Sequence, residues 1–195
     1  MPSNPQRRTE LADAGLRVLA AAGARGLTHR AVDAEAGVPT GTTSNYFRTR
    51  DALLAALGER IFQRLTPSQE VPDPLGDAEP SVSLFAAYVR AVAERVLGAP
   101  DLALALLELR LEATRRPALA SALSRTLAAG YQADVSFHAD RQLPGGAREV
   151  EVLHYAIDGL VLDRLTPSIG AGTDVDTVVG DLVHRLMGDG DTGPA

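Results

Sequence analysis

The chain of 195 residues has no cysteine and no lysine, so disulfides, thiolate metal ligands and a cysteine nucleophile are excluded. Tryptophan is absent and aromatic residues make up only 4% of the chain. No apolar run reaches the roughly 18 residues that a membrane span needs, and the N-terminal residues lack the apolar core of a secretory signal. We therefore expect a cytoplasmic protein with no membrane partner.

Charge is distributed unevenly along the chain. Residues 1–64 contain nine Arg and six acidic residues, a net charge of +3, whereas residues 65–195 contain ten Arg and nineteen acidic residues, a net charge of −9. A basic head on an acidic body favours a polyanionic partner for the head. A charge of +3 is modest, however, and also suits an ordinary solvated surface.

Residues 1–65 predict a small helical head that begins with a flexible arm over residues 1–8. Apolar residues at helical spacing start after Thr9 and end at a pair of glycines. Thr28 is a suitable N-cap for a short helix over residues 29–36, and Thr49 is suitable for a long amphipathic helix.

The rest of the chain is also helical in pattern. Residues 66–80 form a Pro-rich and acidic linker, residues 81–188 form a larger helical domain, and we expect residues 189–195 to be disordered. The prediction is an all-α protein of about nine helices, with no alternating strand pattern and no internal repeat.

The segment "AGVPTGTTSNYF", residues 36–47, separates two amphipathic helices. Two short helices joined by a tight turn with glycine indicate a helix-turn-helix, whose second helix enters the DNA major groove. Small side chains let the backbone approach the groove, and Thr, Ser and Asn side chains can bond to base edges or phosphates. An ordinary α-hairpin in a bundle is the alternative interpretation.

Here the chain resembles the TetR (tetracycline-repressor-like) family of transcriptional regulators. The likeness lies in "LTHRAVDAEAGVPTGTTSNYFRTRDALLAAL", residues 27–57. The resemblance implies a three-helix DNA-binding head joined to a ligand-binding and dimerisation domain. It implies that Arg7 and Arg8 reach a neighbouring groove or backbone, and that Phe47 is a core residue. It also implies DNA contacts from nine residues: Thr28, Arg30, Thr40, Gly41, Thr42, Asn45, Tyr46, Arg48 and Arg50.

Three positions depart from the family pattern. Thr43 stands where an apolar residue is common, Ser44 where an aromatic one is common, and Pro39 where a capping Ser or Thr is usual. Either the recognition helix packs on a smaller core, or these positions contact DNA differently. The operator sequence therefore cannot be transferred from relatives.

Six polar or amphipathic residues lie on mostly apolar helices of the second domain, where burial is costly without a partner or ligand. One interpretation is a ligand pocket with an apolar lining and a few polar groups. The alternative is internal pairing, for example of Glu108 or Glu112 with Arg115, or of His154 with Asp158. The candidate ligand residues are Tyr88, Glu108, Glu112, Tyr131, His154 and Asp158. His154 and Asp158 alone are too few to predict a metal site, and no cofactor is expected.

The resemblance implies a homodimer through the last two helices, and Gly159 would permit close helix approach. The leading hypothesis is a repressor that leaves its DNA operator when an unknown small-molecule effector binds. The sequence shows no nucleophile–base set, phosphate loop or metal cluster, so we do not expect an enzyme. The alternative is a helical small-molecule-binding protein or enzyme whose N-terminal module binds protein instead of DNA.

Overall fold

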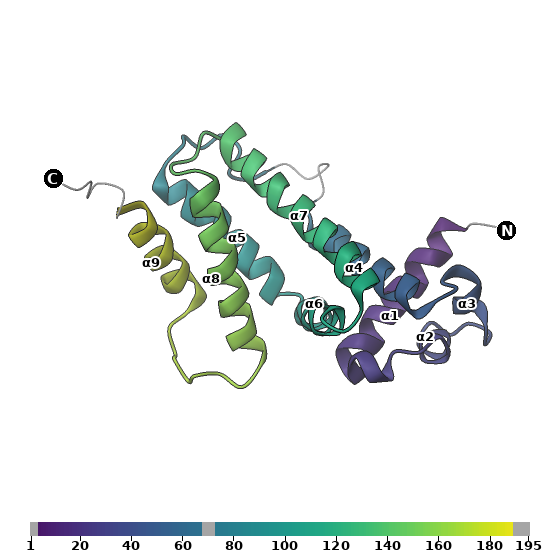
Figure 1. Cartoon of the computed structure of the whole chain (residues 1–195). Coiled ribbons are helices and arrows are strands. Elements are labelled where there is room, and N and C mark those ends of the chain that lie inside the picture. The colour runs from purple at the N-terminus through teal and green to yellow at the C-terminus, as the bar shows by residue number, and fades with distance from the viewer. Residues whose placement is uncertain (1–3, 68–72, 189–195) are drawn as a thin grey trace. The chain divides into compact units, whose positions relative to one another are not determined.

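Nine α-helices and no strand occur within residues 4–67 and 73–188, the parts of the chain that the computed structural model describes (Figure 1). This confirms the all-α prediction. The helices are α1 (Pro5–Gly26), α2 (His29–Glu35), α3 (Thr42–Tyr46), α4 (Arg50–Leu65), α5 (Val82–Leu97), α6 (Pro100–Ala113), α7 (Pro117–Asp140), α8 (Ala147–Leu165) and α9 (Val175–Gly188). The tail, for which disorder is predicted, lies outside the described residues.

The chain divides into two compact units. The first combines Met1–Thr66 with Ala99–Ala128, and the second combines Pro67–Gly98 with Ala129–Ala195. Helix α6 and the first part of α7 thus pack in the same unit as the predicted DNA-binding head. The functional division at residues 66–80 stays a prediction.

The first unit has its core around α1, which packs against α2, α4 and α6. The core side chains are fully buried and mostly leucine, with Phe47 at the end of α3 among them, as expected. A Cβ atom at Gly15 would lie 2.8 Å from Cδ2 of Leu57, so the missing side chain lets α1 approach α4 closely. The second unit has a separate core in which α5 packs against α8 and α9.

The ends of the head helices follow from their capping residues. The Oγ1 atoms of Thr28 and Thr49 accept backbone N–H groups three residues later, at 3.1 Å each, which confirms both predicted N-caps. The predicted flexible arm is wrong for the residues that the structure describes. Asn4 caps α1 and Pro5 occupies its first turn, so Arg7 and Arg8 are helical.

None of the helices within the described residues is both long enough and apolar enough to cross a membrane.

Candidate nucleic-acid interface and ligand site

Helices α2 and α3 are joined by a turn that contains two glycines with left-handed backbone. Gly37 has a φ of 64° and Gly41 a φ of 95°, conformations that glycine adopts without steric cost. The second of these glycines directly precedes α3, which has only five residues. The two short helices and their tight turn have the arrangement of a helix-turn-helix.

The outer surface of α3 carries small polar groups. Thr40, Ser44 and Asn45 are exposed, and Gly41, Thr42 and Tyr46 are half-buried. The hydroxyl of Thr42 donates to the Pro39 carbonyl at 2.6 Å, and that of Ser44 donates to the Gly41 carbonyl at 2.8 Å. Neither Thr42 nor Asn45 lies in a packed interior, so both are placed where a DNA groove could reach them. Their contacts with DNA stay predictions.

Thr43 points the other way and is fully buried against Asp33 of α2, a residue that the sequence analysis missed. Asp33 is 2% exposed. Its carboxylate accepts the Gly41 N–H at 2.7 Å, the Thr43 N–H at 2.7 Å and the Thr43 hydroxyl at 2.5 Å. Of the two explanations for the unusual Thr43, packing against the head is therefore the one that the structure supports.

The hydrogen bonds also determine the ionisation of Asp33. Burial alone raises the pKa of its carboxyl group. The bonds from Thr43 and Gly41, together with the charge of His29, outweigh burial and hold the pKa below its usual value of 3.8. Asp33 is thus an ionised acid inside the head.

Four arginines for which the resemblance implies DNA contacts fall into two groups. Arg30 and Arg48 are exposed, and in the part of the chain that the structure describes neither has a polar partner. Arg8, by contrast, donates to the Tyr46 carbonyl at 3.2 Å and stacks over the Phe47 ring, 4.4 Å from its centroid. Arg7 pairs with Glu10 at 2.9 Å on the same helix.

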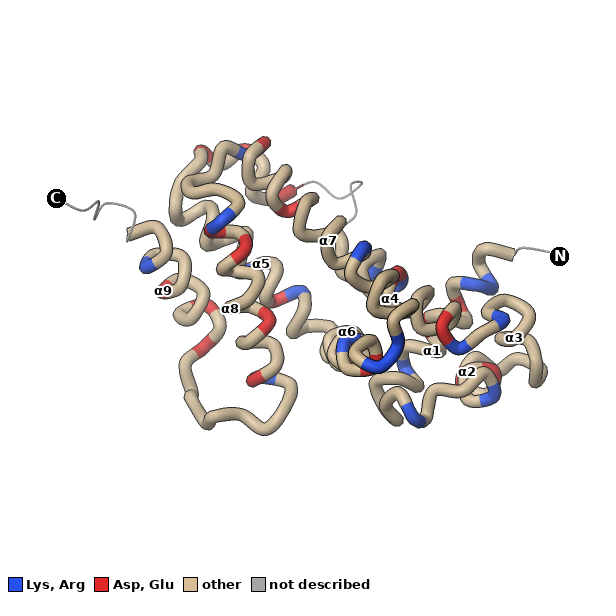
Figure 2. The backbone as a smooth tube through the Cα atoms, viewed as in Figure 1, with Lys and Arg blue, Asp and Glu red and all other residues tan. Residues whose placement is uncertain are grey.

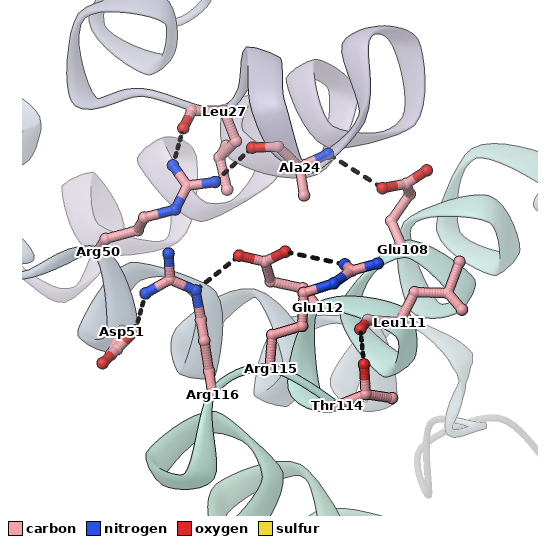
Figure 3. A network of polar contacts seen from close by, with 10 residues as sticks. All are labelled: Ala24, Leu27, Arg50, Asp51, Glu108, Leu111, Glu112, Thr114, Arg115 and Arg116. Atoms are coloured by element: carbon pink, nitrogen blue, oxygen red, sulfur yellow. Dashed lines mark hydrogen bonds and ion pairs between the residues drawn. The ribbon is translucent and has the colours of Figure 1, made fainter.

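Arg50, for which the resemblance implies a DNA contact, is half-buried and has partners within the protein (Figure 3). Its guanidinium donates to the carbonyls of Ala24 and Leu27, at the end of α1. A contact between Arg50 and a DNA phosphate stays a prediction.

The structure separates the six candidate ligand residues. Glu108 and Glu112 lie in the first unit, and the other four lie in the second. Glu108 accepts the Ala24 N–H at 3.0 Å, directly after the kink at Gly23. A ligand contact for either glutamate stays a prediction, and the bonds of both fit the alternative of internal pairing.

Glu112 belongs to an ion-pair network around the start of α7 (Figure 3). It pairs with Arg116 at 2.6 Å and with Arg115 at 3.7 Å, and Arg116 also pairs with Asp51 of α4 at 2.9 Å. The bond from Arg116 holds the pKa of Glu112 below its usual range, and the same bond raises the pKa of Arg116.

Tyr88 is also engaged within the protein. Its hydroxyl donates to Asp73 at 2.6 Å, and its ring meets that of Phe137 edge-on, with 4.9 Å between the centroids. Burial, and then the bond to Asp73, raise the pKa of Tyr88. Arg141 lies nearby and donates to the carbonyls of residues 75, 76 and 78, which holds this turn in place.

The remaining three candidates line one hollow of about 260 Å³ on α7 and α8. The lining residues are Tyr131, Glu151, His154, Tyr155 and Asp158. The rings of Tyr131 and His154 meet edge-on at 5.5 Å, and the His154 Nε2 lies 3.1 Å from a carboxylate oxygen of Asp134 on α7. The sequence analysis missed Glu151, which lies one turn before His154, and Tyr155, which directly follows His154 on the same helix.

The chemistry of the hollow suits a cation. Glu151 accepts the Tyr155 hydroxyl at 2.9 Å and pairs with Arg148 at 2.9 Å, and these bonds lower the pKa of Glu151, so it is ionised at neutral pH. Figure 2 shows the acidic residues of α8 in red. Carboxylates beside tyrosine faces attract organic cations by charge and by cation–π interaction. In the described segments no group of three acidic or histidine side chains could hold a metal ion.

Two family models match the chain. The model described as "Bacterial regulatory proteins, tetR family" matches residues 11–57, and "Tetracyclin repressor-like, C-terminal domain" matches residues 80–189. No curated protein matches significantly.

Solved structures are similar over nearly the whole chain. A transcriptional regulator from Rhodococcus sp. Rha1 is 22% identical with a TM-score of 0.70, over 96% of this chain and 99% of that one, and shows the fold alone. The multidrug binding protein EbrR complexed with ethidium is 27% identical, with a TM-score of 0.70 over 93% and 98% of the two chains. A TetR-family member from Streptomyces coelicolor A3 is 25% identical, with a TM-score of 0.66 over 94% and 99%.

Proposed function

The chain belongs to the TetR family of bacterial regulatory proteins, and we propose that it is a cytoplasmic, non-enzymatic repressor whose homodimer leaves its DNA operator when a small molecule binds. The observation that carries the proposal is the surface of α3. Its exposed side chains are small and polar, and its one fully buried residue is Thr43. Such a thin helix fits the major groove.

The DNA contacts divide into two kinds. We assign base contacts to Thr40, Thr42 and Asn45, with Gly41 allowing close approach, because Thr40 and Asn45 have exposed side chains without a protein partner within the described residues. Phosphate contacts come from Arg30 and Arg48, which have no polar partner among the described residues, from the Tyr46 hydroxyl, and from Thr28 at the start of α2. Arg50 donates to the carbonyls of Ala24 and Leu27, so we propose a structural role for it.

A gel-shift titration with the DNA that flanks the gene tests this proposal. We expect a specific shift whose strength falls steeply with salt, because neutralised phosphates release counterions. Asn45→Ala should weaken specific binding, whereas Gln132→Ala, an exposed polar change on α7, should not. A purified protein that shows no preference among duplexes, even after selection from a random pool, would refute it.

For the effector we propose an organic cation with an aromatic surface, bound at the hollow of α7 and α8. Its carboxylates and tyrosines supply the chemistry, and EbrR, 27% identical to this chain, is complexed with ethidium. Coupling of about 1–3 kcal/mol suffices for a graded response, and DNA must then weaken effector binding by the same factor.

Ethidium fluorescence titrations test the effector site directly. Glu151→Gln and Asp158→Asn should weaken ethidium binding, and Glu94→Gln, an exposed charge-matched change on α5 of the same unit, should not. Equal affinities of all four proteins for the dye would place the effector elsewhere.

The homodimer is proposed to form through α8 and α9. Both helices contain a glycine in open space, Gly159 and Gly180, where an added Cβ atom would meet nothing within 4 Å. On α8, Leu162 is 47% exposed and follows Gly159 at a helical spacing that puts both on one face. Burial of this face between two copies would give the two heads needed for a near-palindromic operator.

Sedimentation equilibrium tests the dimer. Gly159→Leu places its Cβ atom where nothing lies within 4 Å in the single chain, so we expect a folded monomer with weakened operator binding. Ala133→Leu on the exposed side of α7 is the matched control and should stay dimeric. If the Gly159 variant is as dimeric as the wild-type protein, the interface lies on another surface.

A further inference from the structure

Helix α3 begins without a capping side chain of its own. Its N-cap is Gly41, which has no side-chain acceptor for the first amides of the helix. The missing acceptor comes from α2, where the Asp33 carboxylate takes the N–H groups of Gly41 and Thr43. Asp33 therefore caps α3 as an N-cap Asp caps an ordinary helix, although it lies on the neighbouring helix α2.

The link between Asp33 and Thr43 is buried and fully bonded. Asp33 is 2% exposed and Thr43 is 0% exposed. A buried carboxylate is tolerated only when hydrogen bonds compensate for the lost water, and here three donors do so. Hydrogen bonds are directional, so this link fixes where α3 starts and how it is rotated, whereas an apolar contact would tolerate sliding.

We propose that Asp33 is a positioning residue for DNA recognition, which holds α3 in the rotation that presents its base-contacting residues. Asp33 touches no DNA in this proposal and acts through Thr43 and the start of α3. The inference rests on the proposed function of α3. It adds that operator specificity depends on an ionised side chain in α2.

The decisive variant is Asp33→Asn, which keeps the shape but replaces one acceptor oxygen with an NH₂ group that faces N–H and O–H donors. Glu35→Gln is the control, because it removes the same charge from the same helix at an exposed site, where its surface pair with Arg17 of α1 contributes little to stability. Hydrogen bonds to a buried charge are strong, so we expect the Asn variant to bind the operator about tenfold more weakly, or worse. Thr43→Ser keeps the hydroxyl and should remain close to wild type.

Two readouts separate positioning from simple support of folding. First, affinity for a non-specific duplex and its salt dependence should stay at the wild-type value, because phosphate contacts from Arg30 and Arg48 do not need α3 in its exact rotation. Second, the Gly41 and Thr43 amides should lose hydrogen-exchange protection in the Asn variant.

Two outcomes overturn the inference. The first is that Asp33→Asn binds the operator with an affinity within about twofold of wild type. The second is that Asp33→Asn loses specific and non-specific binding equally and also unfolds at a lower midpoint than the wild-type protein. A wild-type protein that prefers no duplex refutes the proposed function instead, and amide exchange then still tests whether Asp33 caps α3.

Discussion

Alanine substitutions at Arg50 and Arg48 would separate a structural arginine from a DNA-binding one. The guanidinium of Arg50 donates to the Ala24 and Leu27 carbonyls, and carbonyls at the end of α1 have no further helical turn to bond to. Two charge-assisted bonds, discounted because the side chain is half-exposed, are worth about 2 kcal/mol together. Arg50→Ala should therefore lower the free energy of unfolding by about this amount, and Arg48→Ala should leave it unchanged.

The salt dependence of DNA binding should show the opposite pattern: it should change in the Arg48 variant and stay the same in the Arg50 variant. Each lost phosphate contact reduces the slope of log affinity against log salt by about 0.9. A dimer loses one contact in each of its two heads, so the slope of the Arg48 variant should be smaller by about 1.8. The Arg50 variant should bind more weakly with an unchanged slope. Fluorescence anisotropy over about 50–200 mM salt, beside urea unfolding followed by circular dichroism, measures both quantities. A reduced slope with undiminished stability in the Arg50 variant would refute this reasoning and restore Arg50 as a phosphate anchor.

Three other features can be tested by single substitutions. Gly37 has a φ of 64°, so alanine there should destabilise the fold by about 1–2 kcal/mol. Calorimetry should show a larger loss for alanine at Gly23, because its φ of 64° and ψ of −178° are accessible essentially to glycine alone. Asp33 has a pKa below 3.8 in the folded state, so its contribution to stability is present above about pH 4 and is lost as the pH falls through the folded pKa. In Asp33→Asn the free energy of unfolding should therefore fall less steeply as the pH is lowered below about 4. The same fall as in the wild-type protein would contradict the lowered pKa of Asp33. Arg141→Gln should raise hydrogen exchange over residues 75–78, whose carbonyls it binds; unchanged exchange would show that this turn is held by other contacts.

Helical periodicity was enough to predict the fold, because each helix buries a regular apolar face. The hydroxyls before α2 and α4 also predicted their starts correctly. The error at the N-terminus has a clear cause. Periodicity has no signal until Leu11, the first buried apolar residue of α1, whereas the true start is given by Asn4 and Pro5, a cap and first-turn pair that needs no apolar side chain.

The inward side of the α2–α3 motif was harder to predict than its outward side. A run of Thr and Ser predicts hydroxyl groups that face DNA, but the sequence does not show which residues of the run face outward and which face the protein. Which member turns inward depends on the backbone of the two left-handed glycines between α2 and α3, and these decide that Thr43, and not Thr42, meets Asp33. The pairing joins residues ten apart across a non-helical turn, so no helical spacing rule could indicate it.

The two glutamates of α6 illustrate a different ambiguity. An acidic residue on an apolar helix must be compensated for its burial, and either a bound ligand or a nearby arginine of the protein can do this. Arg116 is only four residues after Glu112 but lies in the break between α6 and α7, so helical spacing alone could not assign the pair. On α8 the sequence pattern was more informative, because Glu151, His154, Tyr155 and Asp158 share one uninterrupted helix and line one hollow. The analysis selected only His154 and Asp158, and their contact with a ligand stays a prediction.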